Sequence, residues 1–235
     1  ERLLTNIINI MKEKGYLGLN IDFENVFPQD REAYNQFLQR AVDRLHPENF
    51  FVSSALAPKT SGEQRGLLYE AHDYEAHGRI LDFVILMTYE WGYTYGPPMA
   101  VAPLDQVRRV LDYAVTAIPP EKIMMGIPNY GYVWTLPYTP GTAATTISNP
   151  GAVDLARREG AIIQYDQTAQ APFFTYYGDD GKQREVWFED ARSILAKLTL
   201  ANEFGLGGIS YWTIGRYFPQ NWLILNEVYD IIKVL

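Results

Sequence analysis

Cysteine is absent from this chain of 235 residues, and histidine is scarce. The first absence excludes disulfide bonds, thiolate catalysis and cysteine-ligated metals. The three histidines are His46, His72 and His77, and the last two are spaced so that they would not share one face of a helix. With no other cluster of ligands in the sequence, we expect no metal site.

Long apolar runs are also missing, because none approaches the ~18 residues that a membrane-spanning helix needs. We therefore expect no membrane span, and residues 1–4 do not resemble a basic and then apolar targeting signal. Basic residues number 20 against 28 acidic ones, and the net charge of −8 argues against a nucleic acid partner. The chain has no internal repeat, low-complexity run or linker rich in proline and serine.

Aromatic residues, by contrast, are abundant: they make up 14% of the chain, with 17 tyrosines and 5 tryptophans. Strands and packed cores explain much of this content. Sugar-binding clefts also use flat aromatic faces, so the composition mildly favours a carbohydrate ligand. A hydrophobic content of 47% allows a sizeable core in one or two domains.

Helical and strand patterns alternate along most of the chain. The spacing of apolar residues predicts helices at 2–14, 30–45, 63–77, 103–117, 189–204 and 222–233. It predicts mostly apolar strands at 17–23, 50–56, 80–88, 122–128 and 207–213. This alternation indicates an α/β fold in which helices cover a parallel sheet.

One stretch, residues 133–188, abandons the alternation. It has the pattern of a small inserted α+β unit, with a helix at 150–159 and a hairpin that joins 173–177 to 185–188. The expected division of the chain is therefore 1–132, 133–188 and 189–235.

Five parallel strands are fewer than the eight of a (β/α) barrel, which typically has ~250 residues. Five such strands alone would leave two long apolar edges exposed, which is an aggregation hazard. The sequence leaves two possibilities open: a smaller open sheet, or a barrel whose first three strand–helix units are not in this chain.

The strand near residue 17 carries Asn20, Asp22 and Glu24 at alternate positions, so the three side chains would share one face. Burying unpaired charge on such a strand would be costly. Two close carboxylates repel each other, so one pKa rises and that acid stays protonated near neutral pH. A protonated Glu24 beside Asp22 would suit general acid catalysis, although a solvated pair at a strand end would look the same in the sequence.

Three further predicted strands end in aromatic or carboxylate side chains. Tyr89 and Glu90 follow one of them, Tyr130 follows the next, and Trp212 follows the last. In a barrel of parallel strands, the C-terminal strand ends form the active site. Taken singly, each of these aromatic residues fits core packing better than a site.

Together these segments resemble the family 18 glycoside hydrolases, the chitinase-type TIM barrels. The fourth-strand signature of that family is D-x-x-D-x-D-x-E, and the matching positions here are Leu17, Asn20, Asp22 and Glu24. Its motifs M-x-Y-D, G-x-P-x-Y-G and Gly-Gly…Trp are matched by 87–90, 126–131 and 207–212. The resemblance covers essentially the whole chain and implies strands four to eight of a TIM (β/α)8 barrel, with an α+β insertion after the seventh strand.

Three positions depart from the family pattern. Leu17 and Asn20 stand where the family has its first two aspartates, and Glu90 stands where it has the sixth-strand aspartate. An amide can still hydrogen-bond Asp22, so we expect retuned acidity and not a loss of activity. The intact Glu24 argues against an inactive, lectin-like member.

The resemblance implies a retaining glycosidase that works by substrate-assisted hydrolysis. Glu24 would be the proton donor, Asp22 would orient the 2-acetamido group of the sugar, and Tyr89 would hydrogen-bond the acetamido oxygen. No cofactor is implied. Contacts to the substrate would come from Asn20, Glu90, Tyr130 and Trp212.

Within that family, residues 20–25 and 95–100 look most like the bacterial spore-cortex-lytic and sporulation-linked N-acetylglucosaminidases. The expected substrate is a β-linked N-acetylglucosamine glycan, namely the peptidoglycan of the spore cortex. A chitinase acting on free chitin and a non-catalytic glycan-binding protein are the alternatives. This likeness implies a location at the spore or cell wall, and LysM-type modules ahead of the barrel, which do not occur in this sequence.

Overall fold

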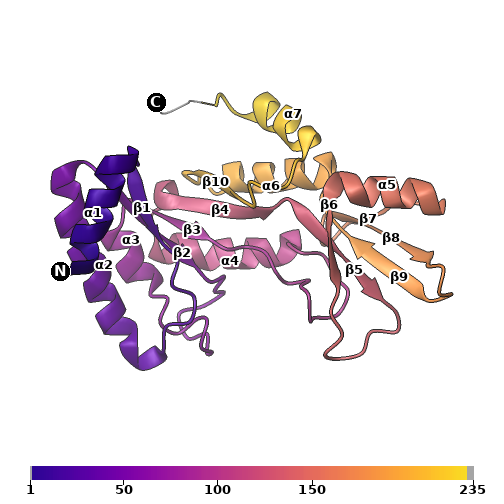
Figure 1. The fold of residues 1–235 in the computed structure, drawn as a ribbon, viewed down its shortest axis with the longest axis horizontal. Helices are drawn as coiled ribbons and strands as arrows, with labels where there is room; N and C mark the ends of the chain where they lie inside the picture. Colours follow the sequence, from indigo (N-terminus) through magenta and orange to yellow (C-terminus); the bar gives the residue numbers. More distant parts are fainter. Residues whose placement is uncertain (1, 232–235) are drawn as a thin grey trace. The chain divides into compact units, whose positions relative to one another are not determined.

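The computed structural model describes residues 2–231 and contains two compact units (Figure 1). The first unit comprises Glu1–Met87, Arg109–Met125 and Phe204–Ile209. The second comprises Thr88–Arg108, Gly126–Glu203 and Ser210–Leu235. Each unit has a sheet of its own, and each is described separately below.

The sheet of the first unit has five strands in the order β1-β2-β3-β4-β10. The pairs β1–β2, β2–β3 and β3–β4 are all parallel. Both β4 and β10 begin in the first unit and end in the second. The strands are β1 (Gly18–Ile21), β2 (Phe51–Leu56), β3 (Phe83–Leu86), β4 (Ile123–Pro128) and β10 (Gly208–Trp212).

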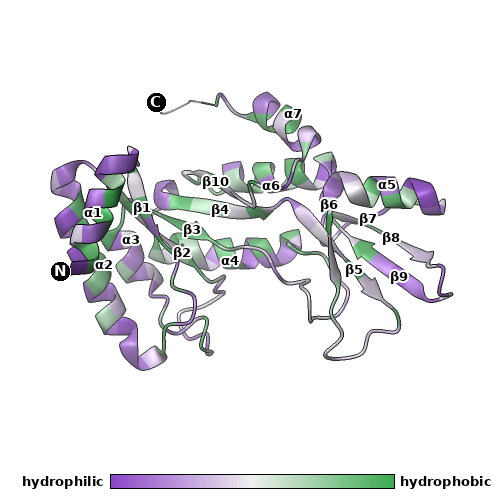
Figure 2. Ribbon diagram, viewed as in Figure 1, coloured by the Kyte–Doolittle hydropathy of each residue, from purple (hydrophilic) through white to green (hydrophobic). Residues whose placement is uncertain are grey.

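Helices connect the successive strands from β1 to β4, as is usual in parallel crossovers, and one more helix precedes β1. The bounds are α1 (Arg2–Lys14), α2 (Arg31–Leu45), α3 (Tyr74–Ile80) and α4 (Leu104–Ala117), with short 3-10 turns at Pro28–Asp30, His46–Glu48 and Pro120–Lys122. In α1 the buried residues are Leu4, Ile8 and Met11, which recur at helical spacing on one face. Figure 2 shows the resulting mixture of hydrophobic and hydrophilic turns along α1 and α2.

The core of the first unit surrounds β2, which is buried from Val52 to Leu56. A strand buried on both of its faces is what a parallel sheet covered by helices requires. Leu38, Leu45 and Leu56 are fully inaccessible to solvent. Each such leucine contributes ~1.5–3 kcal/mol relative to an exposed one. By contrast, β1, at the edge of the sheet, has only Ile21 buried among its four residues.

The sheet of the second unit is antiparallel, with the order β6-β5-β9-β8-β7. Its strands are β5 (Tyr130–Thr135), β6 (Thr145–Ser148), β7 (Gln164–Asp166), β8 (Ala171–Tyr177) and β9 (Gln183–Trp187). Its helices are α5 (Asn149–Glu159), α6 (Ala191–Glu203) and α7 (Pro219–Val228). Asn129 alone separates β5 from the end of β4.

Side chains from α5, β8 and β9 form one core of this unit, in which Leu155, Phe174 and Val186 are buried. In the same unit, Lys197 and Glu189 form an ion pair of 2.8 Å, and each side chain is 1% exposed. Capping residues stop helix α5 at both of its ends. The Ser148 hydroxyl accepts the amide N–H of Gly151, and Gly160 ends the helix with a φ of 63°.

The structure confirms the α/β class and the parallel pairing. The predicted strand at 17–23 is shorter than expected, because it ends at Ile21. The predicted helix at 63–77 is wrong over most of its length, since α3 begins only at Tyr74. The reason is local: Gly66 has a φ of 128°, which no α-helix contains, and the Asp73 carboxylate accepts the amide N–H of Ala76 as an N-cap.

The strand predicted at 80–88 is also shorter in the structure, since Ile80 ends α3 and β3 covers only Phe83–Leu86. The other boundaries agree more closely. The last predicted helix, at 222–233, is Pro219–Val228 in the structure, and its final predicted positions lie outside the described residues. Between residues 2 and 231, no helix has the length and apolar character needed to cross a bilayer. Over the same range, no group of three or more carboxylate or imidazole side chains could hold a metal ion.

Candidate active site

The two acidic side chains predicted to do chemistry follow directly after β1. Asp22 and Glu24 are both exposed, and the strand itself stops at Ile21. Of the three side chains predicted to share one strand face, only Asn20 therefore belongs to β1, and the two acids lie beyond its end. Exposure keeps both carboxylates hydrated, which avoids the cost of burying two charges side by side.

The electrostatics of this pair have the predicted direction. Partial burial and, after it, the neighbouring charge of Asp22 raise the pKa of the Glu24 carboxyl above its usual value. A raised pKa keeps more of Glu24 protonated at neutral pH, as a general acid needs.

Asn20 has a different partner from the one expected. Its Nδ2 donates a hydrogen bond of 2.9 Å to Oγ of Ser53 on the neighbouring strand β2. No Asn20–Asp22 hydrogen bond is found in the described part of the chain. Asn20 therefore links two strands of the sheet at the level where β1 ends.

Phe23, between the two acids, is held at its ring and at its backbone. The ring stacks on Tyr34 and on Phe37, with centroid separations of 5.8 Å in both cases. The carbonyl oxygen lies 3.0 Å from Nε2 of His72. No signal in the sequence indicates this contact, because His72 falls within the helix predicted at 63–77.

In the second unit, the carboxylate of Glu90 accepts hydrogen bonds from two tyrosines. One donor is the hydroxyl of Tyr130, and the other is the hydroxyl of Tyr132, at 3.0 and 3.2 Å from the two carboxylate oxygens. Glu90 has a φ of 66°, in the left-handed region that costs a non-glycine residue of order 1 kcal/mol or more. Such strain persists where the surroundings fix the residue, as the two tyrosines do here.

Tyr130 itself is only 5% exposed, and with Tyr132 and Trp134 it forms a buried aromatic cluster. Tyr89 packs against this cluster and is half-buried. Tyr132 was not among the predicted site residues. Its position two residues after Tyr130 would place both rings on the same side of a strand, which is a signal that the sequence does carry.

Trp212 ends β10 and is 55% exposed. The residues after it are held by Asn129, which is 3% exposed. Asn129 Nδ2 donates to the carbonyl oxygens of Thr213, at 2.7 Å, and Arg216, at 3.3 Å. Its Oδ1 accepts the amide N–H of Thr213 at 2.7 Å. Asn129 is thus a second supporting residue that the sequence did not single out.

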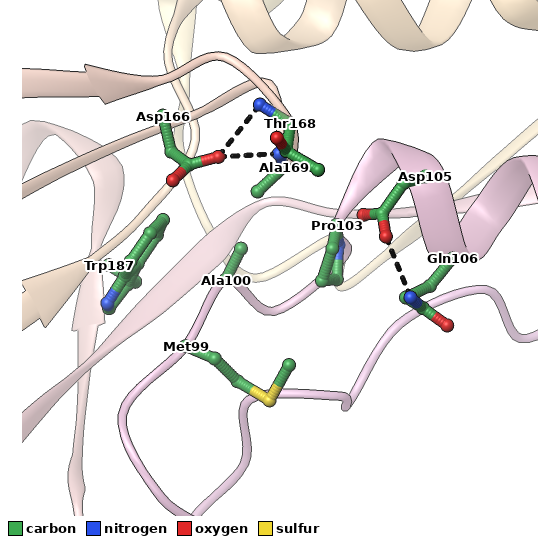
Figure 3. Close-up of a pocket in the computed structure, with 9 residues that line it drawn as sticks. All are labelled: Met99, Ala100, Pro103, Asp105, Gln106, Asp166, Thr168, Ala169 and Trp187. Atoms are coloured by element: carbon green, nitrogen blue, oxygen red, sulfur yellow. Dashed lines mark hydrogen bonds between the residues drawn. The ribbon is translucent and has the colours of Figure 1, made fainter.

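A pocket of about 230 Å³ lies in the second unit (Figure 3). It is smaller than the ~300 Å³ at which ligand pockets usually begin. Both of its carboxylates already accept hydrogen bonds, that of Asp166 from two backbone amides and that of Asp105 from Gln106. None of the predicted site residues lines it: its walls are Met99, Ala100, Pro103, Asp105, Gln106, Asp166, Thr168, Ala169 and Trp187.

Comparison with known proteins supplies the family. A family model described as "Glycosyl hydrolases family 18" matches residues 1–216. The chain belongs to glycosyl hydrolase family 18. The predicted resemblance is therefore confirmed.

Individual members of family 18 are similar over nearly the whole chain. The cortical fragment-lytic enzyme of Bacillus subtilis (strain 168) is 55% identical over 233 residues, which are 99% of this chain and 54% of that protein. The crystal structure of the Bacillus cereus spore cortex-lytic enzyme SleL matches with a TM-score of 0.95 and 51% identity, over 98% of this chain and 53% of that one. The chain thus spans about half the length of these relatives.

A chitinase of the family is similar as well. The crystal structure of the chitinase from Chromobacterium violaceum ATCC 12472 matches with a TM-score of 0.89 and 30% identity, over 96% of this chain and 70% of that one. The likeness to chitinase-type structures of family 18 agrees with the α/β architecture described above.

Proposed function

We propose that this chain is the catalytic part of a retaining glycosidase that cleaves β-linked N-acetylglucosamine glycans, with spore-cortex peptidoglycan as the substrate. The observation that carries the proposal is Glu24, a carboxyl with a raised pKa that lies close to Asp22, just beyond the end of a parallel strand in a family 18 chain. The names of the similar Bacillus enzymes support the choice of cortex.

In the proposed reaction, Glu24 gives its proton to the glycosidic oxygen as the bond to the anomeric carbon breaks. The carbonyl oxygen of the substrate's own 2-acetamido group attacks that carbon and forms an oxazolinium ion, so no protein nucleophile is needed. Asp22 orients the acetamido N–H and stabilises the positive charge. Glu24, now a carboxylate, takes a proton from the water that attacks the anomeric carbon, and the acetamido group is restored.

The remaining predicted residues have proposed roles in holding the sugar. Tyr89 donates a hydrogen bond to the acetamido oxygen, and Trp212 offers an apolar face to the ring that is cleaved. Glu90 supplies a polar contact, and Tyr130 acts through Glu90, since its own hydroxyl is bound to that carboxylate. Asn20 acts through the end of β1, which it ties to β2.

We further propose that the five strands β1, β2, β3, β4 and β10 correspond to strands four to eight of a TIM (β/α)8 barrel. The family membership supports this assignment, as does the order of the strands. In this assignment the barrel comprises residues 1–132 and 189–235, and the insertion comprises residues 133–188. A spore or cell-wall location and LysM-type modules in the whole protein belong to the same proposal.

A chitinase acting on free chitin is the second candidate function, favoured by the 30% identity to the chitinase of known structure. A panel of substrates distinguishes the two enzymes from a protein that only binds glycans. The panel contains purified spore-cortex fragments, N-acetylglucosamine oligomers, chitin and a glucose polymer of matched length. Cleavage of cortex fragments in preference to chitin supports the proposal, and binding without cleavage of any member supports the glycan-binding alternative.

The first variant to test on this panel is Glu24→Gln. We expect its rate to fall by at least ~10²-fold, the lower end of what general acid–base catalysis contributes. The matched control is Glu32→Gln, which neutralises another exposed glutamate of the first unit, in the first turn of α2. Equal rates on the glucose polymer and the N-acetylglucosamine oligomers would refute the substrate-assisted mechanism.

A further inference from the structure

The strongest unassigned feature of the chain is a buried histidine that contacts the backbone between the two proposed catalytic acids. His72 is 1% exposed, and its ring makes two hydrogen bonds. Nδ1 lies 2.8 Å from the amide nitrogen of Ala57, and Nε2 lies 3.0 Å from the carbonyl oxygen of Phe23.

These two partners determine the protonation of the ring. A backbone amide can only donate, so Nδ1 of His72 has to be the acceptor from Ala57. A carbonyl oxygen can only accept, so Nε2 carries the proton and donates to Phe23. The ring is therefore neutral, with its hydrogen on Nε2. Burial, which lowers the pKa of His72, favours the same neutral form.

The bond to Phe23 complements the aromatic contacts of the same residue. Its ring rests on Tyr34 and Phe37, while its carbonyl oxygen is held from the interior by His72. Asp22 and Glu24 flank this fixed residue and stay exposed. Because the strand has already ended at Ile21, no ladder of sheet hydrogen bonds fixes this backbone.

We propose that His72 is a positioning residue that fixes the backbone between Asp22 and Glu24 and so aims the Glu24 carboxyl at the glycosidic oxygen. This inference rests on the proposed function of Glu24. His72 touches no substrate in this role. It acts only through the carbonyl group of Phe23.

A second buried histidine provides a matched control. His77 is fully buried, its ring centroid lies 6.3 Å from that of His72, and its Nδ1 is hydrogen-bonded to Oγ of Ser54 at 2.8 Å. His72→Phe and His77→Phe each replace a buried imidazole with a ring of similar size and remove its hydrogen bonds. Only the first substitution frees the carbonyl group of Phe23.

The experiment compares two substrates in the full chain. One is an N-acetylglucosamine oligomer, whose sugar leaving group needs protonation, and the other is a 2,4-dinitrophenyl N-acetylglucosaminide, whose leaving group departs with little help. We expect His72→Phe to lower kcat on the oligomer by about 10- to 100-fold more than on the dinitrophenyl substrate, since a displacement of ~1 Å can cost ~10²-fold. KM should change little, and His77→Phe should lower both rates equally.

His72→Gln serves as the rescue variant, because its amide NH2 group can donate and its carbonyl oxygen can accept, as the two ring nitrogens of the neutral imidazole do. It should recover part of the rate on the oligomer. Equal losses on the two substrates in His72→Phe, or the same selective loss in His77→Phe, would overturn the positioning role.

Hydrogen exchange separates this inference from the proposed function. The backbone amides of residues 22–25 should exchange faster in His72→Phe than in His77→Phe. If the unmodified protein cleaves neither substrate, the proposed function fails, while faster exchange in His72→Phe would still show that His72 holds this segment. Unchanged exchange would refute the anchoring itself.

Discussion

Replacing Asn129 with alanine should weaken substrate binding through Trp212. The substitution removes two hydrogen bonds to Thr213, both of 2.7 Å, and one to Arg216 of 3.3 Å. At ~1 kcal/mol each, these bonds amount to about 3 kcal/mol of unfolding free energy. For a chain of this size, that loss lowers Tm by roughly 6–12 °C.

The functional consequence follows from the position of Thr213 directly after Trp212. Without the Asn129 hydrogen bonds to Thr213, we expect KM for N-acetylglucosamine oligomers to rise about tenfold, equivalent to ~1.4 kcal/mol of binding free energy. Initial-rate kinetics measure KM, and circular dichroism on heating measures Tm.

The control is Asn149→Ala, which removes another buried asparagine whose Oδ1 accepts the amide N–H of Glu189 at 2.9 Å. It should lower Tm and leave KM unchanged. If Asn129→Ala shows the same pattern as Asn149→Ala, then Asn129 does not position Trp212.

Two further predictions concern charge. Asp22→Asn removes a neighbouring charge that raises the pKa of Glu24, so the pKa of Glu24 should fall. Glu24 should then lose its proton at a lower pH than in the unmodified protein. The alkaline limb of the plot of kcat/KM against pH should therefore move to lower pH. A limb that stays in place or moves to higher pH would contradict this account. Lys197→Met leaves the buried Glu189 unpaired and should cost ~3–5 kcal/mol of stability in denaturant titrations. An unchanged midpoint would show that Glu189 is protonated and needs no counter-charge.

Much of the first unit was predictable because its signals are local. The amphipathic spacing predicted the bounds of α1, and the apolar runs predicted β2 and β4 to within one residue at each end. The helix predicted at 63–77 failed because Gly66 and the N-cap Asp73 decide that segment, and the apolar spacing alone did not weigh them.

That failure also hid a contact. Placed in one helix, His72 and His77 would lie on different faces. With α3 beginning at Tyr74, their rings lie 6.3 Å apart in the same core.

In the candidate site, only the residues that their type and their position on a predicted strand single out could be predicted. Asp22 and Glu24 were predicted from their alternation, and the raised pKa of Glu24, which partial burial and then the charge of Asp22 cause, has the expected direction. The supporting residues His72 and Asn129 were not found. Their partners, Phe23 and Thr213, lie 49 and 84 positions away along the chain, and no local pattern reports such a pairing.

The junction between β4 and β5 limits how the family can vary in length. Only Asn129 separates the two strands, so one inserted residue there would reverse which side of β5 each side chain faces. Tyr130 and Tyr132 would then turn to the side now occupied by Gly131, where the backbone of Trp187 leaves no room for even a Cβ atom. Insertions and deletions among relatives should therefore be excluded at 129 and tolerated in the exposed residues 139–143 between β5 and β6.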